Sequence, residues 1–115
     1  MVGKTKTPTK AQRRRFASLQ TRGCVACALD GRLREPPDIH HLVEGGRRLG
    51  HDYTIPLCPW HHRGLPPGGL SIHDARDILG PSLALAKRAF VERYGDERHL
   101  LTVANLMIDR MEGAA

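Results

Sequence analysis

The sequence predicts a small α+β domain. A short hairpin and helix are held together by a bound metal, with a basic N-terminal helix before them and a helical tail after them. Three observations lead to this prediction. The chain has 115 residues and only 4% aromatic residues, which suffices for one domain but leaves a thin apolar core. Its three cysteines and a nearby histidine occur in two closely spaced pairs, and apolar residues recur at helical spacing toward the C-terminus.

The N-terminal segment is basic. Residues 1–8 lack apolar periodicity, so we expect a disordered arm there. From residue 10 to residue 20 the pattern predicts a short helix, which Thr9 or Thr7 can cap and Gly23 ends. The bias suits a polyanion such as nucleic acid, and the alternative is a tail that only aids solubility. Seven cations precede the first acidic residue, Asp30: Lys4, Lys6, Lys10, Arg13, Arg14, Arg15 and Arg22.

Two pairs of metal ligands follow, Cys24-x-x-Cys27 on a tight turn and Cys58-x-x-His61. Together they form a full tetrahedral ligand set for one structural Zn²⁺, and thiolates favour zinc over magnesium. Such binding contributes on the order of 10 kcal/mol to folding, which would compensate for the thin core. The alternatives are three buried apolar cysteines, or His62 in place of His61 as the fourth ligand.

The ligand pairs enclose a predicted hairpin. Residues 39–43 and 53–57 read as strands, and the glycines and arginines of residues 45–48 as a loop. Pro59 suits the first position of a short helix over residues 59–63, which the glycines and prolines of residues 64–69 end. This zinc-stapled core spans residues 24–73.

The tail, residues 74–115, is predicted to be helical and to complete a single domain over residues 9–115. Apolar spacing indicates one helix over residues 82–94 and another from residue 97 to about residue 112, capped by Asp96. The sequence has neither 18 consecutive apolar residues nor a secretory signal, so we expect a cytoplasmic monomer without membrane contact.

Six of the seven histidines fall between His40 and His73, which is more clustered than a random scatter. His61 and His62 are neighbours on the predicted short helix, so their side chains diverge by about 100°. They cannot easily bind one ion together, but they can bind two different ions.

These residues carry a family resemblance. The run Cys24-x-x-Cys27, Ile39-His40-His41 and Thr54-Ile-Pro-Leu-Cys58-x-x-His61-His62 resembles an HNH endonuclease of the ββα-metal fold with an embedded zinc. The longer strings are similar to the phage Ref proteins, recombination-enhancement nucleases that depend on RecA, over roughly residues 20–105. Those strings are His40-His41-Leu-Val-Glu-Gly-Gly-Arg-Arg, Thr54-Ile-Pro-Leu-Cys-Pro-Trp-His-His-Arg-Gly64, Ser71-Ile-His73 and Phe90-Val-Glu-Arg-Tyr-Gly95.

The resemblance implies roles by position. His41 matches the general base that deprotonates the attacking water, for which a neutral imidazole is needed. His40 and His62 match ligands of a catalytic Mg²⁺ or Mn²⁺, and His73 matches a downstream position for a third ligand. The implied substrate is DNA in a RecA filament or displacement loop during phage recombination, inside the bacterial host if a phage encodes the chain.

Two features do not fit easily. Neighbours on a regular strand point to opposite faces, so His40 and His41 share one site only if the strand ends or twists there. The middle Asn of the general HNH motif, which holds the loop bearing the base, is absent. Asp52 can replace it by accepting backbone N–H groups, while His51 can orient His41 or contact DNA.

Cations near these histidines are candidates for phosphate contact, which positions DNA without reading its sequence; the alternative is a solvated surface. They are Arg13, Arg14 and Arg15 of the arm and helix, with Arg47, Arg48 and Arg63. Two other functions stay open from the sequence. One is a non-catalytic, zinc-stabilised module that binds DNA or a recombinase, and the other is an RNA-directed HNH nuclease.

Overall fold

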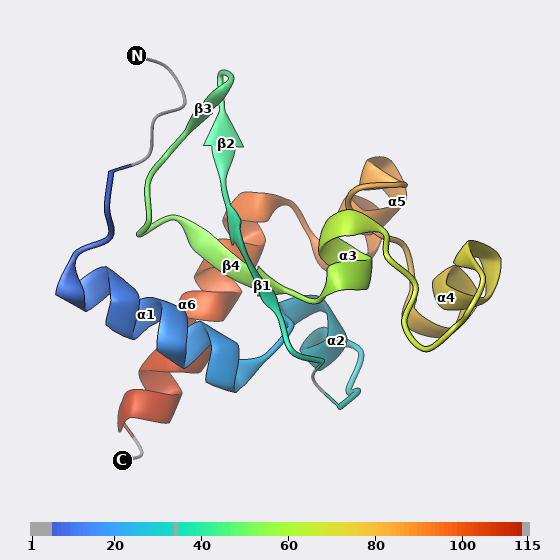
Figure 1. The fold of residues 1–115 in the computed structure, drawn as a ribbon, viewed down its shortest axis with the longest axis horizontal. Helices are drawn as coiled ribbons and strands as arrows, with labels where there is room; N and C mark the ends of the chain where they lie inside the picture. The colour runs from blue at the N-terminus through green and yellow to red at the C-terminus, as the bar shows by residue number, and fades with distance from the viewer. Residues whose placement is uncertain (1–5, 34, 114–115) are drawn as a thin grey trace.

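Two small antiparallel sheets and six helices make up the described part of a computed structural model, which covers residues 6–33 and 35–113 (Figure 1). In chain order they are α1 (Lys10–Arg22), α2 (Val25–Leu29), β1 (Asp38–His41), β2 (Val43–Glu44), β3 (Arg47–Arg48), β4 (Thr54–Leu57), α3 (Pro59–Arg63), α4 (Ile72–Leu79), α5 (Lys87–Tyr94) and α6 (Glu97–Gly113). The predicted α+β fold, with a basic first helix and a helical tail, is confirmed.

Strands β1 and β4 form the central sheet. They pair antiparallel, with His40 opposite Ile55 and His41 opposite Thr54. β4 is buried along its whole length, which fits its apolar sequence. The pairing is regular at both histidines, so their side chains leave opposite faces of the sheet.

The second sheet is a hairpin of β2 and β3 that extends away from the helices (Figure 1). The sequence predicted a continuous strand over residues 39–43 and a loop over residues 45–48. Instead, buried Leu42 interrupts the strand, and its N–H donates to the Tyr53 carbonyl at 2.9 Å. Gly45 and Gly46 form the turn at φ values of 59° and 76°, which glycine adopts without strain.

Helix α1 has the predicted limits. Thr9 caps it in a capping box with Gln12, and Gly23 ends it at φ 85°. The helix packs against β1, β4 and α6. Of the predicted arm, residues 1–5 lie outside the described residues. Residues 6–8 contact the fold, since the Lys6 carbonyl accepts a hydrogen bond from His51 Nε2 and the Pro8 carbonyl accepts one from Arg13 at 2.8 Å.

The metal-ligand segments differ slightly from the prediction. The turn at Cys24 continues into the short helix α2, where Cys24 Sγ accepts the N–H of Cys27 at 3.5 Å. Helix α3 is as predicted, with Pro59 in its first turn and Gly64 ending it in the left-handed region.

The tail holds one helix more than the periodicity indicated. Ser71 caps α4 by accepting the N–H of Asp74. The helix predicted over residues 82–94 is shorter, because α5 begins only at Lys87. Buried Ser82 accounts for this, since its hydroxyl accepts the N–H of Ala84 at 3.2 Å and offers the backbone a turn instead of a helix. Helix α6 runs as predicted, with Asp96 accepting the N–H of His99 at 2.8 Å.

The core is one cluster to which α1, α2, β4, α3, α5 and α6 all contribute. Its largest fully buried side chains include Phe90, Leu19, Ile55, Leu57 and Leu100. The cysteines and His61 belong to the same buried region, so the metal ligands lie inside the core. None of the described helices has the length and apolar character needed to span a membrane.

Candidate functional site

Three cysteines and one histidine meet inside the core. The ligand atoms of Cys24, Cys27, Cys58 and His61 all lie within 4.8 Å of one another, and all four residues are buried. His61 Nδ1 is 3.5 Å from Cys24 Sγ, 3.7 Å from Cys27 Sγ and 3.2 Å from Cys58 Sγ. The predicted ligand pairs therefore form one group that can hold a metal ion. Three sulfurs and an imidazole nitrogen are the donor set of a structural zinc.

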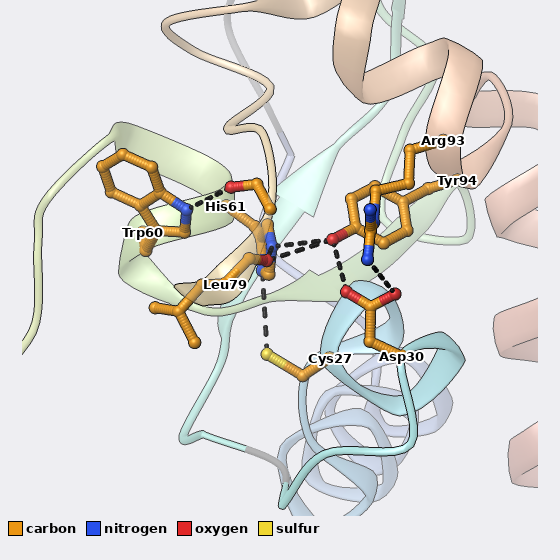
Figure 2. A network of polar contacts seen from close by, with 8 residues as sticks. Cys27, Asp30, Trp60, His61, Leu79, Arg93 and Tyr94 are labelled. Carbon is orange, nitrogen blue, oxygen red and sulfur yellow. Dashed lines mark hydrogen bonds and ion pairs between the residues drawn. The ribbon is translucent and has the colours of Figure 1, made fainter. Parts of the chain in front are cut away.

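Hydrogen bonds fix the orientation of His61. Its Nε2 lies 2.8 Å from the Leu79 carbonyl oxygen, which can only accept, so Nε2 carries the proton and Nδ1 presents its lone pair to the sulfurs (Figure 2). The Tyr94 hydroxyl lies 3.1 Å from the same carbonyl and 2.7 Å from Asp30 Oδ2. Arg93 forms an ion pair with Asp30 at 3.1 Å. Such outer partners set the tautomer of a metal-binding histidine.

The side chains of the cysteine cluster differ in how their pKa values are shifted. Hydrogen bonds from Cys24 and Cys27 lower the pKa of the Cys58 thiol, despite its burial. The pKa of Cys24 is raised by hydrogen bonds with Cys27 and Cys58 and by burial. Burial lowers the pKa of His61, but hydrogen bonds with Cys27 and Cys58 outweigh it and raise the value to about 9. Metal ligands must be deprotonated, so a divalent cation bound here would displace the remaining thiol protons and any proton on His61 Nδ1.

His40 belongs to a second cluster, between β1, α3 and the start of α6. Its ring lies edge-on to the ring of His62, with centroids 5.0 Å apart. His40 Nε2 is 3.3 Å from Glu97 Oε2, and His62 Nδ1 is 2.9 Å from Asp38 Oδ2. Arg63 also donates to Asp38 Oδ2, at 2.8 Å. The structure thus brings together the two histidines that were expected to share an ion.

His41 belongs to a third cluster, on the other face of β1. Its Nε2 is 2.9 Å from His51 Nδ1, and the ring of Phe16 packs edge-on against both histidines. Since His51 Nε2 contacts the Lys6 carbonyl oxygen, that nitrogen carries the proton and Nδ1 is left to accept. In the neutral pair, His41 Nε2–H therefore donates to His51, and His41 Nδ1 keeps a free lone pair.

Both histidines of β1 favour the neutral form. Burial lowers the pKa of His41, and the nearby cation Arg48 and the imidazoles of His51 and His40 lower it further. Burial also lowers the pKa of His40, although Glu97 acts in the opposite direction. Neutral imidazoles can accept a proton or bind a metal.

His73 lies apart from these clusters. It is on α4, which is well separated from β1 (Figure 1), and its side chain is 70% exposed. Its ring nitrogens contact Asp77 and Arg76 of the same helix, both at 3.1 Å. The Gly- and Pro-rich loop after α3 carries α4 away from the hairpin. The structure therefore does not bring His73 to His40 and His62, as the third-ligand expectation required.

The candidate phosphate-binding arginines differ in exposure. Arg14, Arg47 and Arg48 are exposed. Arg15 instead lies partly buried, and its guanidinium donates to the side chain and carbonyl of Thr54 and, at 2.7 Å, to Asn105 Oδ1. Its nitrogens already hold α1 to β4 and α6, so the expectation of a phosphate contact does not fit Arg15.

The described residues form a small α+β core with a group of three cysteines and one histidine that can hold a metal ion, and further histidines lie on strand β1 and on the short helix α3. A family model described as "Recombination enhancement, RecA-dependent nuclease" matches residues 8–109 of this chain. The match extends from Pro8, just before the N-cap of α1, to near the end of α6. The chain belongs to this family of RecA-dependent nucleases.

Three contacts of the site were missed or left open by the sequence. The sequence indicated only that Glu97 begins a helix. Its contact with His40 joins residues 57 positions apart, and no local pattern in the sequence predicts such a contact. Asp38, at the start of β1, had no predicted role in the site, and it binds His62. Asp52 was the candidate replacement for the absent Asn, whereas His51 was expected to orient His41 or to contact DNA, and the structure places His51 against His41.

Proposed function

We propose that this protein is a divalent-metal-dependent DNA endonuclease of the HNH type, and that it hydrolyses phosphodiester bonds in DNA engaged by RecA. The observation that carries the proposal is the arrangement around β1. His40 and His62 meet on one face, and His41 is held by His51 on the other. Membership of a nuclease family favours this function over a non-catalytic binding module, which needs neither histidine pair.

The buried cysteine cluster is the proposed structural zinc site. Cys24 and Cys27 come from the α1–α2 connection and α2, whereas Cys58 and His61 come from the N-terminus and body of α3. A zinc ion bound to all four would join the N-terminal helices to the hairpin and α3. This staple supports the thin core and does not take part in hydrolysis.

His41 is the proposed general base. Its Nε2–H donates to His51, so Nδ1 is the atom that takes the proton from the attacking water. Burial and the cation Arg48 keep the imidazole neutral near pH 7, and Phe16 packs against its ring. His51 is a positioning residue, because it fixes the tautomer of His41 without contacting the water.

His40 and His62 are the proposed ligands of the catalytic ion. His62 Nδ1–H donates to the Asp38 carboxylate, which leaves Nε2 as its ligand atom. Bound Mg²⁺ or Mn²⁺ would contact the scissile phosphate and stabilise the leaving oxyanion. His41 is the last residue of β1, so we place the phosphate at that end of the strand, where the base and the ligands can approach it from the two faces.

The exposed arginines are the proposed phosphate contacts along the DNA. Arg14 lies on α1, and Arg47 and Arg48 lie on the β2–β3 hairpin. Arg13 donates to the Pro8 carbonyl, and Arg63 is paired with Asp38 at the His62 side. Such contacts hold the duplex over the site without reading its sequence.

The test is cleavage of supercoiled plasmid DNA with RecA, a homologous single-stranded oligonucleotide and Mg²⁺. We expect cutting at the displacement loop, loss of cutting when Mg²⁺ is replaced by a chelator, and strong reduction when RecA is omitted. Equal cutting of an RNA competitor would contradict the DNA preference. Zinc-loaded, folded protein that binds the DNA but never cuts it would contradict the endonuclease and support a binding module.

A further inference from the structure

Glu97 stands out among the carboxylates because it reaches the histidine cluster from a distant part of the chain. It is the first residue of α6, and its Oε2 lies 3.3 Å from His40 Nε2. Its side chain is three-quarters buried, with 25% exposed. A helix N-terminus favours a carboxylate, so α6 presents this anion at the face of β1 that carries His40.

The chemistry of the proposed ion calls for such a group. Two imidazoles alone suit zinc, copper or nickel better than Mg²⁺ or Mn²⁺, which prefer carboxylate and other oxygen donors. The carboxylate of Asp38 is engaged by His62 and Arg63, so it orients a ligand rather than acting as one. His73, the third ligand expected from the sequence, is on α4 with its own partners. Glu97 is the carboxylate in contact with His40.

We propose that Glu97 is the third protein ligand of the catalytic ion and forms a two-histidine, one-carboxylate site with His40 and His62. This inference rests on the proposed function. The three ligand atoms are not yet gathered as closely as those of the cysteine cluster. The Glu97 side chain must turn from the His40 hydrogen bond onto the ion.

The proposal also gives the C-terminal tail a role in the site. Helix α6 packs against α1 and β4, and Arg15 of α1 binds Asn105 of the same helix. The helix is thereby fixed relative to the sheet, and Glu97 with it. In this proposal the C-terminal tail supplies a metal ligand and does more than cover the core.

The competing role for Glu97 is to orient His40 by a hydrogen bond. Replacement by glutamine separates the two roles, because an amide oxygen still accepts from His40 but is a weak ligand for a divalent cation. If Glu97 only orients His40, Glu97→Gln keeps ion binding. If Glu97 is a ligand, Glu97→Gln loses ion binding and Glu97→Asp retains part of it.

The experiment is Mn²⁺ titration of the full-length, zinc-loaded protein without DNA, followed by electron paramagnetic resonance of free and bound Mn²⁺. The parent protein is expected to bind one Mn²⁺ in addition to its zinc. Glu97→Gln should weaken this binding at least about tenfold, a loss in the range seen when metal-site residues are changed. The matched controls are Glu92→Gln, an exposed glutamate on α5, and His73→Ala, and both should bind as the parent does.

Two results would overturn the inference, and they differ in meaning. If Glu97→Gln binds Mn²⁺ as tightly as the parent while His62→Ala does not, Glu97 is not a ligand, but the proposed nuclease stands. If the parent cuts DNA with Mg²⁺ yet His62→Ala and Glu97→Gln both bind Mn²⁺ normally, the ion is held elsewhere. Zinc content and circular dichroism of each variant identify any loss that is due to unfolding.

Discussion

His41 and His51 lie on either side of the β2–β3 hairpin, yet their rings meet, with His41 Nε2 2.9 Å from His51 Nδ1. This contact assigns the tautomer of both histidines, since His51 Nε2 is engaged by the Lys6 carbonyl. It also bears on the Asn that is absent from the HNH-like pattern. His51, in the loop between β3 and β4, takes up the contact with the proposed base.

Changing His51 should impair hydrolysis without abolishing it. In His51→Ala the ring of His41 loses its acceptor, so both tautomers become populated and only one leaves Nδ1 free for the water. We expect single-turnover cleavage to fall by about tenfold, less than the 10²- to 10⁴-fold contribution of a base itself. His51→Asn, which restores a side-chain acceptor, should recover part of the rate. An unchanged rate in His51→Ala would remove this residue from the mechanism.

Removing one thiolate should destabilise the whole domain. In Cys58→Ser the cluster loses a ligand in the buried core, and the bound zinc that supports folding is lost or weakened. We expect less than one zinc per chain by atomic absorption and a much lower melting temperature. A chelator should have the same effect on the parent protein. A variant with normal melting temperature but no zinc would contradict a structural role for the ion.

Changing a residue that orients His61 without binding the metal should have a smaller effect on the same site. Tyr94→Phe removes the hydroxyl that lies 2.7 Å from Asp30 and 3.1 Å from the Leu79 carbonyl, but keeps the ring that packs on Phe90. Zinc affinity, measured by competition with a chromogenic chelator, should fall by about tenfold. This is the lower end of the loss in metal affinity seen when a residue that orients a metal ligand is changed. Tyr53→Phe is the control, because Tyr53 is exposed and lies outside this network.

Arg15 and Arg14 are neighbours whose replacement should change stability by very different amounts. Arg15→Ala removes hydrogen bonds from a cation to Thr54 and Asn105, so chemical denaturation should show a loss of about 2–3 kcal/mol. Arg14→Ala changes an exposed side chain and should alter the free energy of unfolding by less than about 0.5 kcal/mol. Equal effects of the two changes would mean that the Arg15 contacts contribute nothing net.

The same two positions differ in DNA binding. Arg14→Ala should reduce the slope of log affinity against log salt concentration by about one, because one fewer counterion is released from the duplex. Arg88→Ala is the control, because Arg88 is an exposed side chain on α5, and it should leave the slope unchanged. If Arg14→Ala also leaves the slope unchanged, α1 does not face the DNA.

Much of the fold follows from local signals in the sequence. The limits of α1, α3 and α6 came from residues that act on their own helix, such as Thr9 and Gly64. The four ligands of the buried cluster were recognised from their spacing, since two C-x-x-ligand pairs leave few other arrangements. The late start of α5 was not predicted, because Ser82 acts there through its side chain and burial, not through periodicity.

The candidate site was only partly predictable, because its key contacts join distant elements. The sequence placed His40 and His41 in one site on the condition that the strand ends or twists there, and the structure pairs them regularly with Ile55 and Thr54 at the end of β1. It gave no means to see that α6 brings Glu97 to His40, or that α4 carries His73 away. Such placements are decided by packing of the tail on the sheet.

The most direct test of the proposed mechanism compares His41→Ala with the parent in RecA-dependent cleavage of a plasmid displacement loop with Mg²⁺. Zinc content and DNA affinity are measured for both proteins. His41 lies outside the cysteine cluster, so the variant should remain folded and zinc-loaded. We predict that it binds the DNA as the parent does but cuts it at least about a hundredfold more slowly. Cleavage by His41→Ala at the parental rate would contradict the assignment of His41 as the base.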